Sequence, residues 1–339
     1  MISRLKPRLL PRRKTKRPNR ERSPVTVCIA ALAERTTLIG VSDRMLTAGD
    51  VEFEPAQAKM WRFSNGIWGL VAGDMGIQAE ILKRVDKEIK NRIAAEPSVW
   101  VPVRDAALCY CKHYHELLRD QAESAILHPL GLDLSTFLEK QTVMQKELVL
   151  DIAERLSNYE FPSQLEMIFM GKDNEGPIAN AGEKLVYAHL YVLDGDKLAD
   201  LTTVGFAAIG IGKNHAESQL MFSGHWPMKA FDETILLAYA AKKRAEAAPG
   251  VGKATDIVVI GPALGIDFMI KEEHLGQLEK IYQKSRIASA KAVKKAQEET
   301  KSFIEKVKSE YKPPAEPSKI EVSITPKPEE LNPSPSVKA

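Results

Sequence analysis

The feature that most constrains the fold is a block of four short β-rich runs between Thr26 and Gly73. A polar turn at 34–35 separates the first two runs, and the Ser-Asn-Gly stretch at 64–66 separates the second two. Strand-like runs joined by such turn residues are typical of β-hairpins, so we expect two consecutive hairpins here. The runs are TVCIAALA, TTLIGVSD, AKMWRFS and GIWGLVAG.

After the hairpins, the chain is predicted to form helices in one block and strands in the next. Isoleucine and valine residues recur every four positions from Ile77 to Ile89, which predicts a long amphipathic helix. Blocks of this kind favour an α+β fold with antiparallel sheets over a βαβ repeat. Helices are expected over 74–94, 103–124, 143–156, 214–222 and 228–247, and strands over 166–173, 185–194, 197–204, 206–212, 254–262 and 265–270.

The two ends of the chain differ in composition from its body. Residues 1–25 hold ten Lys/Arg and one acid, with too few apolar residues to fold alone, so a basic disordered leader is expected. Residues 272–311 read as a charged helix, and 312–339 hold seven of the twenty prolines, which predicts a disordered tail. The predicted division is a leader over 1–25, a globular domain over 26–286, a charged helix over 287–311 and the tail.

Composition excludes several classes of protein. At 339 residues and 44% hydrophobic content the chain can bury a large core, and no apolar run is long enough to span a bilayer. The net charge of +3 arises in the leader, because the remainder holds 38 basic and 44 acidic residues. No nucleic-acid partner is therefore expected except through residues 1–25. Three cysteines do not suggest a disulfide framework, so a cytoplasmic location is expected. No membrane partner, metal or cofactor is expected either.

Four residues of the hairpin block form an ordered pattern. Thr26 starts a strand, Asp43 ends one, Lys59 starts another, and Gly73 stands where a strand gives way to a helix. This pattern resembles the N-terminal half of proteasome β-type subunits and, more broadly, the N-terminal-nucleophile hydrolases. It is similar in particular to uncharacterised prokaryotic proteasome-like proteins that begin Met-Thr-Val-Cys-Ile-Ala-Ala. The resemblance implies a four-layer αββα sandwich, with two antiparallel sheets between helical layers, and assembly into a homo-oligomer.

The resemblance also implies a threonine-type peptidase or amidohydrolase. A hydroxyl is a weak nucleophile, and a free α-amine on the same threonine can accept its proton. Thr26 is then the nucleophile, Lys59 lowers the pKa of the amine, Asp43 pairs with Lys59, and Gly73 supplies the oxyanion donor. The expected partner is a peptide or amide substrate. Each residue alone also has an ordinary structural explanation, as a strand, ion-pair or turn residue.

The sequence departs from the family's pattern at two places and raises a question at a third. Ile211 stands between Gly210 and Gly212 where the family usually has serine, and residues 249–253 replace an Asp-x-x-Ser-Gly segment. Val25 precedes Thr26, where subunits with a propeptide usually have glycine. Translation from a GTG codon at Val25, followed by methionine removal, is expected to expose Thr26.

Two other functions remain open. The first is a catalytically inactive, proteasome-like scaffold or assembly subunit, for which the missing serine elements reflect lost chemistry. The second is an interaction protein whose basic leader binds nucleic acid or another acidic surface. Helical Cys111, His113 and His115, and the His225-Trp226-Pro227 loop, give only weak signals of function.

Overall fold

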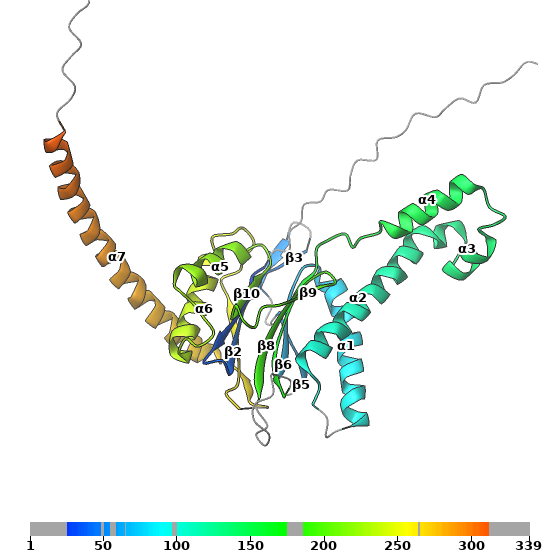
Figure 1. The fold of residues 1–339 in the computed structure, drawn as a ribbon, viewed down its shortest axis with the longest axis horizontal. Helices are drawn as coiled ribbons and strands as arrows, with labels where there is room; N and C mark the ends of the chain where they lie inside the picture. Colours follow the sequence, from blue (N-terminus) through cyan, green and yellow to red (C-terminus); the bar gives the residue numbers. More distant parts are fainter. Residues whose placement is uncertain are drawn as a thin grey trace, which may run out of the picture. The chain divides into compact units, whose positions relative to one another are not determined.

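The computed structural model describes residues 26–48, 51–54, 59–64, 66–96, 100–174, 186–263 and 265–311. The chain divides into two units, Met1–Tyr282 and Gln283–Ala339. The predicted leader over 1–25 and tail over 312–339 lie outside the described residues. The first unit contains two five-stranded antiparallel sheets together with helices (Figure 1), which is the mixed, antiparallel architecture predicted from the sequence.

The first sheet is built on the N-terminal hairpin. Its strand order is β10-β1-β2-β11-β12, so strands that come more than 160 residues later in the chain flank the hairpin on both sides. Glu34 and Arg35 in the connecting turn both have positive φ, and their backbone N–H groups donate to the carbonyls of Lys229 and Pro227. The strands are β1 (Cys28–Ala33), β2 (Thr37–Asp43), β10 (Phe206–Ile209), β11 (Thr255–Ile260) and β12 (Asp267–Met269).

The second sheet has its strands in sequence order, β5-β6-β7-β8-β9. Its first pair is the second predicted hairpin, so the two hairpins of the N-terminal block lie in different sheets. A two-stranded sheet of β3 (Leu46–Ala48) and β4 (Val51–Phe53) connects them along the chain. The strands of the second sheet are β5 (Met60–Ser64), β6 (Ile67–Ala72), β7 (Glu166–Asp173), β8 (Tyr187–Asp194) and β9 (Lys197–Asp200).

One hydrophobic cluster contains residues of both sheets. In β1 the alternate residues Cys28, Ala30 and Leu32 belong to this cluster, because successive side chains of a strand point to opposite faces. The sheets approach closely at Gly40, where an added Cβ would lie 2.2 Å from the Met170 side chain. A glycine in β2 therefore makes room for a methionine of the other sheet.

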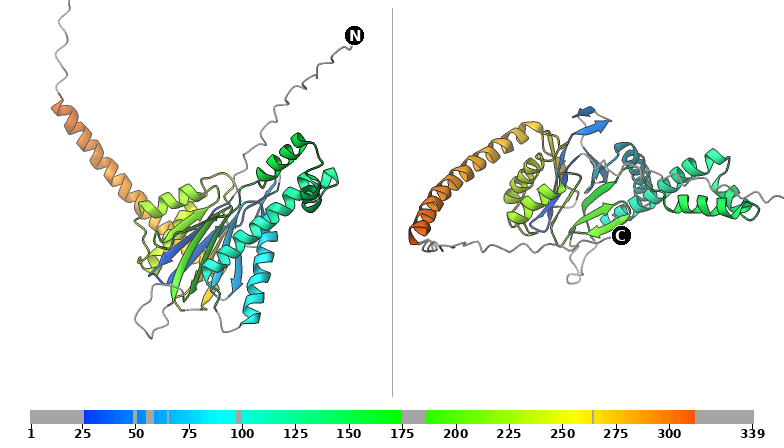
Figure 2. Two further views of the ribbon diagram at one scale, coloured as in Figure 1. Left: turned by 45° about the vertical axis from the view of Figure 1, so that its right-hand side comes forward. Right: turned by 90° about the horizontal axis from the view of Figure 1, so that it is seen from above.

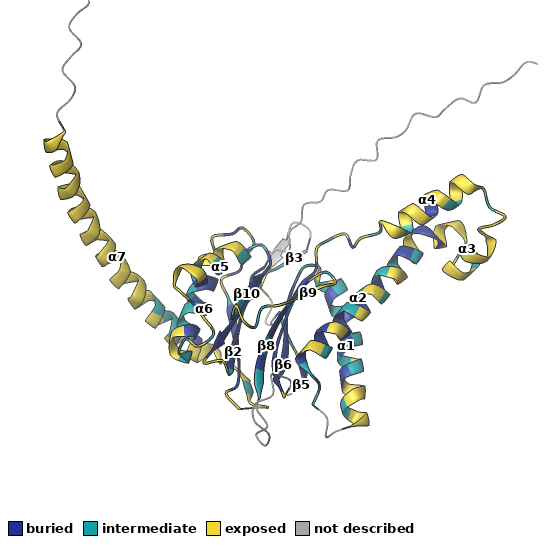
Figure 3. Ribbon diagram, viewed as in Figure 1, coloured by how far each residue is buried: buried dark blue, intermediate teal, exposed yellow. Residues whose placement is uncertain are grey.

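Helices pack against both sheets. The intervening β1 residues Ile29, Ala31 and Ala33 share a cluster with α5 (Lys213–Phe222) and α6 (Phe231–Ala245). A third cluster joins β5–β8 to α1 (Met75–Ala95) and α2 (Val103–Ile126). Figure 2 shows these helix pairs on opposite sides of the strands, and Figure 3 shows that the strands are largely buried.

A small helical cluster forms at the C-terminal end of α2. The 3₁₀ turn η1 (His128–Leu130), α3 (Leu134–Lys140) and α4 (Lys146–Ser157) pack there around Phe137 and Ile152. They lie away from the two sheets (Figure 1). No helix in the described part of the chain is long and apolar enough to cross a membrane.

The last helix, α7 (Glu272–Glu310), begins in the first unit and continues into the second. Its first turns pack against α6, where Leu275 is buried and the Tyr239 hydroxyl donates to the Glu279 carboxylate. From residue 283 to 311 every residue is exposed (Figure 3). The predicted domain boundary at residue 286 falls on this helix, just after the division between the units.

Several predicted segments end earlier than expected. The predicted strand over 206–212 stops at Ile209, because Gly210 has a positive φ of 84° and turns the chain toward α5. The predicted strand over 197–204 stops at Asp200, whose carboxylate accepts the N–H of Thr202 and closes a turn. The sequence analysis missed β3, β4 and α3, all of which are seven residues or shorter.

Candidate active site

Three of the four predicted site residues form one buried hydrogen-bonded group. The Thr26 hydroxyl donates to Asp43 Oδ1 at 2.6 Å, Lys59 Nζ lies 3.0 Å from the same oxygen, and Lys59 also donates to Thr26 Oγ1. Thr26, Asp43 and Lys59 are 2%, 0% and 3% exposed. Burying two charged side chains costs free energy unless each of their donors and acceptors has a partner. The three side chains must therefore keep this arrangement for the buried pair to be stable.

The two hairpins position these three residues. Asp43 ends β2, where its backbone N–H donates to the carbonyl of Val27 and so extends the pairing of β1 with β2. Lys59 directly precedes β5, and its carbonyl accepts the N–H of Val71 in β6. The thiol of Cys28 donates to the carbonyl of the same Val71 at 3.4 Å. Val71 therefore contacts both hairpins close to the buried group.

Asp43 accepts more hydrogen bonds than the sequence predicted. Besides Thr26 and Lys59, the backbone N–H groups of Val27, Met45 and Gly252 donate to its two oxygens at 3.0, 3.1 and 2.9 Å. Backbone N–H donors stabilise the charged form of a carboxylate. Gly252 belongs to the loop over 249–253 that replaces the family's Asp-x-x-Ser-Gly segment, so this loop contacts the site through its backbone.

The loop over 249–253 is held in turn by Lys242 of α6. Its ammonium donates to the carbonyls of Gly252 and Lys253, at 2.9 and 2.8 Å, and pairs with Glu246 at 2.6 Å. Lys242 is fully buried, and this burial lowers its pKa. The sequence analysis missed both Lys242 and Gly252, since a lysine in a helix and a glycine in a loop carry no chemical signal by themselves.

The glycines around Ile211 hold the backbone of Thr26. Gly212 donates its N–H to the Thr26 carbonyl at 3.2 Å, and a Cβ on Gly210 would lie 2.4 Å from that carbonyl oxygen. Ile211 itself packs with the cluster beneath α5 and α6. The Gly210 N–H donates to the buried carboxylate of Glu166, a further residue that the sequence analysis missed.

Gly73, the fourth predicted site residue, follows β6 and precedes the N-cap Asp74 of α1. Its φ of 114° lies in the region that glycine adopts freely, and a Cβ here would lie 2.4 Å from the carbonyl oxygen of Gln164. Among the described residues, Gly73 is not a hydrogen-bonded member of the Thr26 group. It contacts instead the segment that leads into β7.

A cavity of about 670 Å³ lies beside this segment. Residues 160–165, the C-terminal half of α2 and the turn between β8 and β9 line it, and its acidic side chains are Glu160, Asp194 and Asp196. Thr26, Asp43 and Lys59 are not among its lining residues. Gly73 does not line the cavity either, and lies next to it only through its contacts with Gln164 and Leu165.

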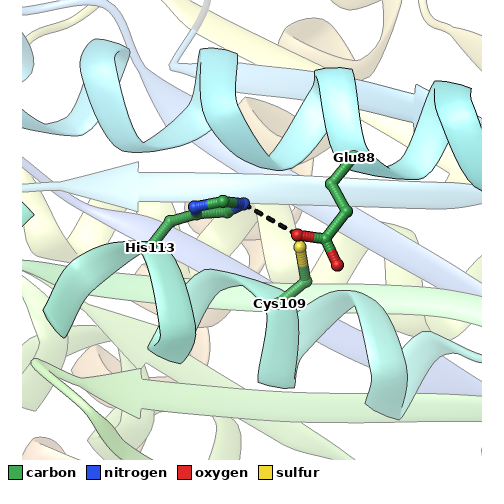
Figure 4. Close-up of side chains that lie close together, drawn as sticks. All are labelled: Glu88, Cys109 and His113. Atoms are coloured by element: carbon green, nitrogen blue, oxygen red, sulfur yellow. Dashed lines mark hydrogen bonds and ion pairs between the residues drawn. The ribbon is translucent and has the colours of Figure 1, made fainter. Parts of the chain in front are cut away.

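The cysteine and histidine residues noted in the sequence lie in two different environments. Cys111 and His115 face the turn between β8 and β9, where each contacts Asp196. His113 faces α1 instead, where its ring and the thiol of Cys109 lie beside Glu88 (Figure 4). Burial, and then the Glu88 carboxylate, raise the pKa of the Cys109 thiol to about 12. Burial likewise raises the pKa of the Cys28 thiol, so neither group is a ready nucleophile.

The chain matches no protein-family model and no curated protein.

Proposed function

We propose that the chain is a threonine-nucleophile amidohydrolase, a proteasome-like peptidase that acts through Thr26. The observation that carries the proposal is the buried group in which Asp43 and Lys59 both contact the Thr26 hydroxyl. A hydroxyl held between a carboxylate and an ammonium has a defined direction, which a nucleophile requires. The resemblance of residues 26–82 to proteasome β-type subunits supports the same assignment.

The proposed reaction needs Thr26 as the N-terminal residue. Its Oγ1 attacks the carbonyl carbon of the scissile amide, while its neutral α-amine accepts the hydroxyl proton. The amine of the substrate leaves with that proton, and the acyl group remains on Oγ1 as an ester. Water then hydrolyses the ester and regenerates Thr26. The backbone N–H of Gly73 is the proposed donor to the developing oxyanion.

Lys59 and Asp43 have distinct proposed roles. The ammonium of Lys59 disfavours a second positive charge nearby and so lowers the pKa of the α-amine. Asp43 keeps Lys59 in place and orients the hydroxyl. Ile211 replaces the family's serine and cannot form its hydrogen bond. In this proposal, the hydrogen bond from Gly252 to Asp43 takes the place of the support that the family's Asp-x-x-Ser-Gly segment gives to the site.

We infer a four-layer αββα sandwich, supported by one cluster shared by the two sheets and two clusters that join each sheet to its own helices. A homo-oligomer acting on peptide or amide substrates follows from the family resemblance. Free cysteines at positions 28, 109 and 111 are compatible with a reducing cytoplasm.

An inactive scaffold subunit is the second candidate function. The observation that favours it is the apolar packing of Ile211 at the position where the family has a serine hydroxyl. In this alternative, the buried Thr26 group stabilises the two hairpins and performs no chemistry. An interaction protein acting through residues 1–25 is the third candidate, and its leader lies outside the described residues.

Labelling by an epoxyketone or β-lactone separates these candidates. Intact mass spectrometry first establishes whether Thr26 is the N-terminal residue of the purified protein. We then expect one adduct on Thr26 in the wild type and in Thr26→Ser, which keeps a hydroxyl, and none in Thr26→Ala. A protein that begins at Thr26 and forms no adduct would be the scaffold. Salt-sensitive nucleic-acid binding that disappears on deletion of residues 1–25 would favour the third candidate.

A further inference from the structure

Three different metal-ligating side chains meet between α1 and α2. Glu88 comes from α1, and Cys109 and His113 lie one turn apart on α2, so both face the same side of that helix. A carboxylate oxygen, the thiol sulfur and an imidazole nitrogen lie within 4.8 Å of one another (Figure 4). Among the described residues this is the one group of three or more His, Cys, Asp or Glu side chains that meets this distance condition.

We propose that Glu88, Cys109 and His113 form a zinc site that joins α1 to α2. Sulfur, nitrogen and oxygen donors together suit Zn²⁺, which accepts all three with bonds of about 2.0–2.3 Å. A tetrahedral ion with such bonds separates its ligands by about 3.3–3.6 Å. His113 Nε2 and Glu88 Oε2 lie 3.0 Å apart, and all three donor atoms lie within 4.8 Å of one another, close to this range. Small side-chain rotations therefore bring all three donors to one ion, and water completes the coordination.

The histidine is already oriented for this role. Its Nδ1 lies 2.7 Å from Glu116 Oε2, which leaves Nε2 directed at Glu88. Metal-bound histidines commonly give their second nitrogen to a carboxylate, because that hydrogen bond fixes the ring and its tautomer. Glu116 is one turn along the same helix and contacts the ring from outside the group. It is therefore a positioning residue for the proposed ligand.

An ion that binds Glu88 must replace contacts that the carboxylate makes with neighbouring basic side chains. Hydrogen bonds from Lys112, and also from Arg92, lower the pKa of Glu88 to about 2, so it is a carboxylate at neutral pH. Arg92 binds Oε1, whereas Lys112 shares Oε2 with His113. The Lys112 side chain is 56% exposed and can swing into solvent. On binding, Zn²⁺ forms bonds to the Cys109 sulfur and to His113 Nε2, and the thiol proton and the Nε2 proton that contacts Glu88 leave to solvent, so the affinity increases with pH.

Access to the site comes from the side of Lys112. The side chains of Glu88 and His113 are 21% and 11% exposed, whereas Cys109 is buried. An ion reaches the oxygen and nitrogen first and the sulfur last. The ion can therefore enter the site without separation of α1 from α2.

Cobalt binding to the untagged, reduced full-length protein tests the proposal, because Co²⁺ takes zinc geometries and shows thiolate charge-transfer absorption. We expect one Co²⁺ per chain with that absorption, displaced by Zn²⁺. Cys109→Ser should abolish the absorption, and His113→Gln should weaken binding. The matched controls Cys111→Ser and His115→Gln lie two residues further along the same helix, face Asp196 and should bind as the wild type does.

A second readout follows metal-dependent stability. Zn²⁺ should raise the midpoint of thermal unfolding of the wild type and of Cys111→Ser, and leave that of Cys109→Ser unchanged. Glu116→Gln should bind Co²⁺ about 10–100-fold more weakly. Absence of thiolate absorption in the wild type, or its loss in Cys111→Ser and persistence in Cys109→Ser, would overturn the proposal. The cluster would then be only an ion pair of Glu88 with His113. Neither readout involves Thr26, so the outcome is independent of the proposed hydrolase.

Discussion

Gly252 donates its backbone N–H to Asp43 Oδ2 at 2.9 Å, joining two residues that are 209 positions apart in the chain. The contact connects the end of the N-terminal hairpin to the loop that precedes β11. Lys242 binds the carbonyls of Gly252 and Lys253 on the other side of this loop. The carboxylate in the candidate active site is therefore supported, through this loop, by a lysine of α6.

Replacement of Lys242 tests this support. Lys242→Met leaves the carbonyls of Gly252 and Lys253 without this donor, whereas Glu246 keeps its ion pair with Lys243, so we expect the free energy of unfolding to fall by about 1–3 kcal/mol. Hydrogen exchange over 249–254 should increase in the same variant. Chemical denaturation and exchange mass spectrometry measure the two effects. Lys253→Met is the matched control, because that side chain is exposed on the same loop, and it should change stability by less than about 0.5 kcal/mol.

Asp43 and Lys59 should behave as a coupled pair. Asp43→Asn and Lys59→Met each leave the other partner buried and incompletely paired, with an expected loss of about 3–5 kcal/mol for each variant. Since the second substitution removes a group that the first has already left incompletely paired, the double variant should lose less than the sum by about 0.5–3 kcal/mol. Denaturant unfolding of the four proteins gives this coupling energy. Simple additivity would show that the two side chains do not interact.

Gly210 is expected to tolerate no side chain. An added Cβ would meet the Thr26 carbonyl oxygen at 2.4 Å, and the residue has a φ of 84°. Gly210→Ala should therefore lose more than about 3 kcal/mol of stability and reduce any labelling of Thr26. Gly224→Ala is the control for backbone strain alone, since Gly224 has a φ of 61° and no atom within 4 Å of its Cβ position. A loss of about 1 kcal/mol is expected there. Equal losses in the two variants would contradict the proposed clash.

His225 should make stability depend on pH below neutrality. Burial lowers its pKa in the folded protein, whereas an unfolded histidine titrates near ~6.5. Below that pH the unfolded chain binds a proton that the folded chain does not, so the free energy of unfolding falls as the pH falls through about 6.5. The contribution reaches at most about 1.4 kcal/mol per pH unit. His225→Gln should flatten this dependence between pH 6.5 and 5. Parallel curves for wild type and His225→Gln would refute the assignment.

Local patterns predicted the regular elements well and the site only in part. The apolar runs of β1, β2 and β7, and the four-residue spacing in α1, are strong because each strand or helix buries a continuous set of side chains. Thr26, Asp43, Lys59 and Gly73 were suggested by family resemblance, and no periodicity distinguishes them. The meeting of Thr26, Asp43 and Lys59 depends on the packing of two separate sheets.

The missed residues show why sequence patterns were insufficient. Gly252 acts through a backbone N–H, which every residue except proline carries, and Lys242 resembles an ordinary helix lysine until α6 is packed. Glu166 starts a strand in which every residue is buried, so its acidic side chain was read only as part of an apolar run. Glu88 and Cys109 are not adjacent in sequence, and only the packing of α1 on α2 brings them together.

The strand order of the first sheet has a consequence for synthesis of the chain. The hairpin of β1 and β2 emerges first, but its neighbours are β10 at Phe206–Ile209 and β11 at Thr255–Ile260. Until those segments leave the ribosome, both edges of an almost entirely apolar hairpin have unpaired N–H and C=O groups. Such edges readily pair with another chain. Completion of this sheet therefore waits for residues 206–269, and nascent chains depend on protection of their first hairpin until those residues have emerged.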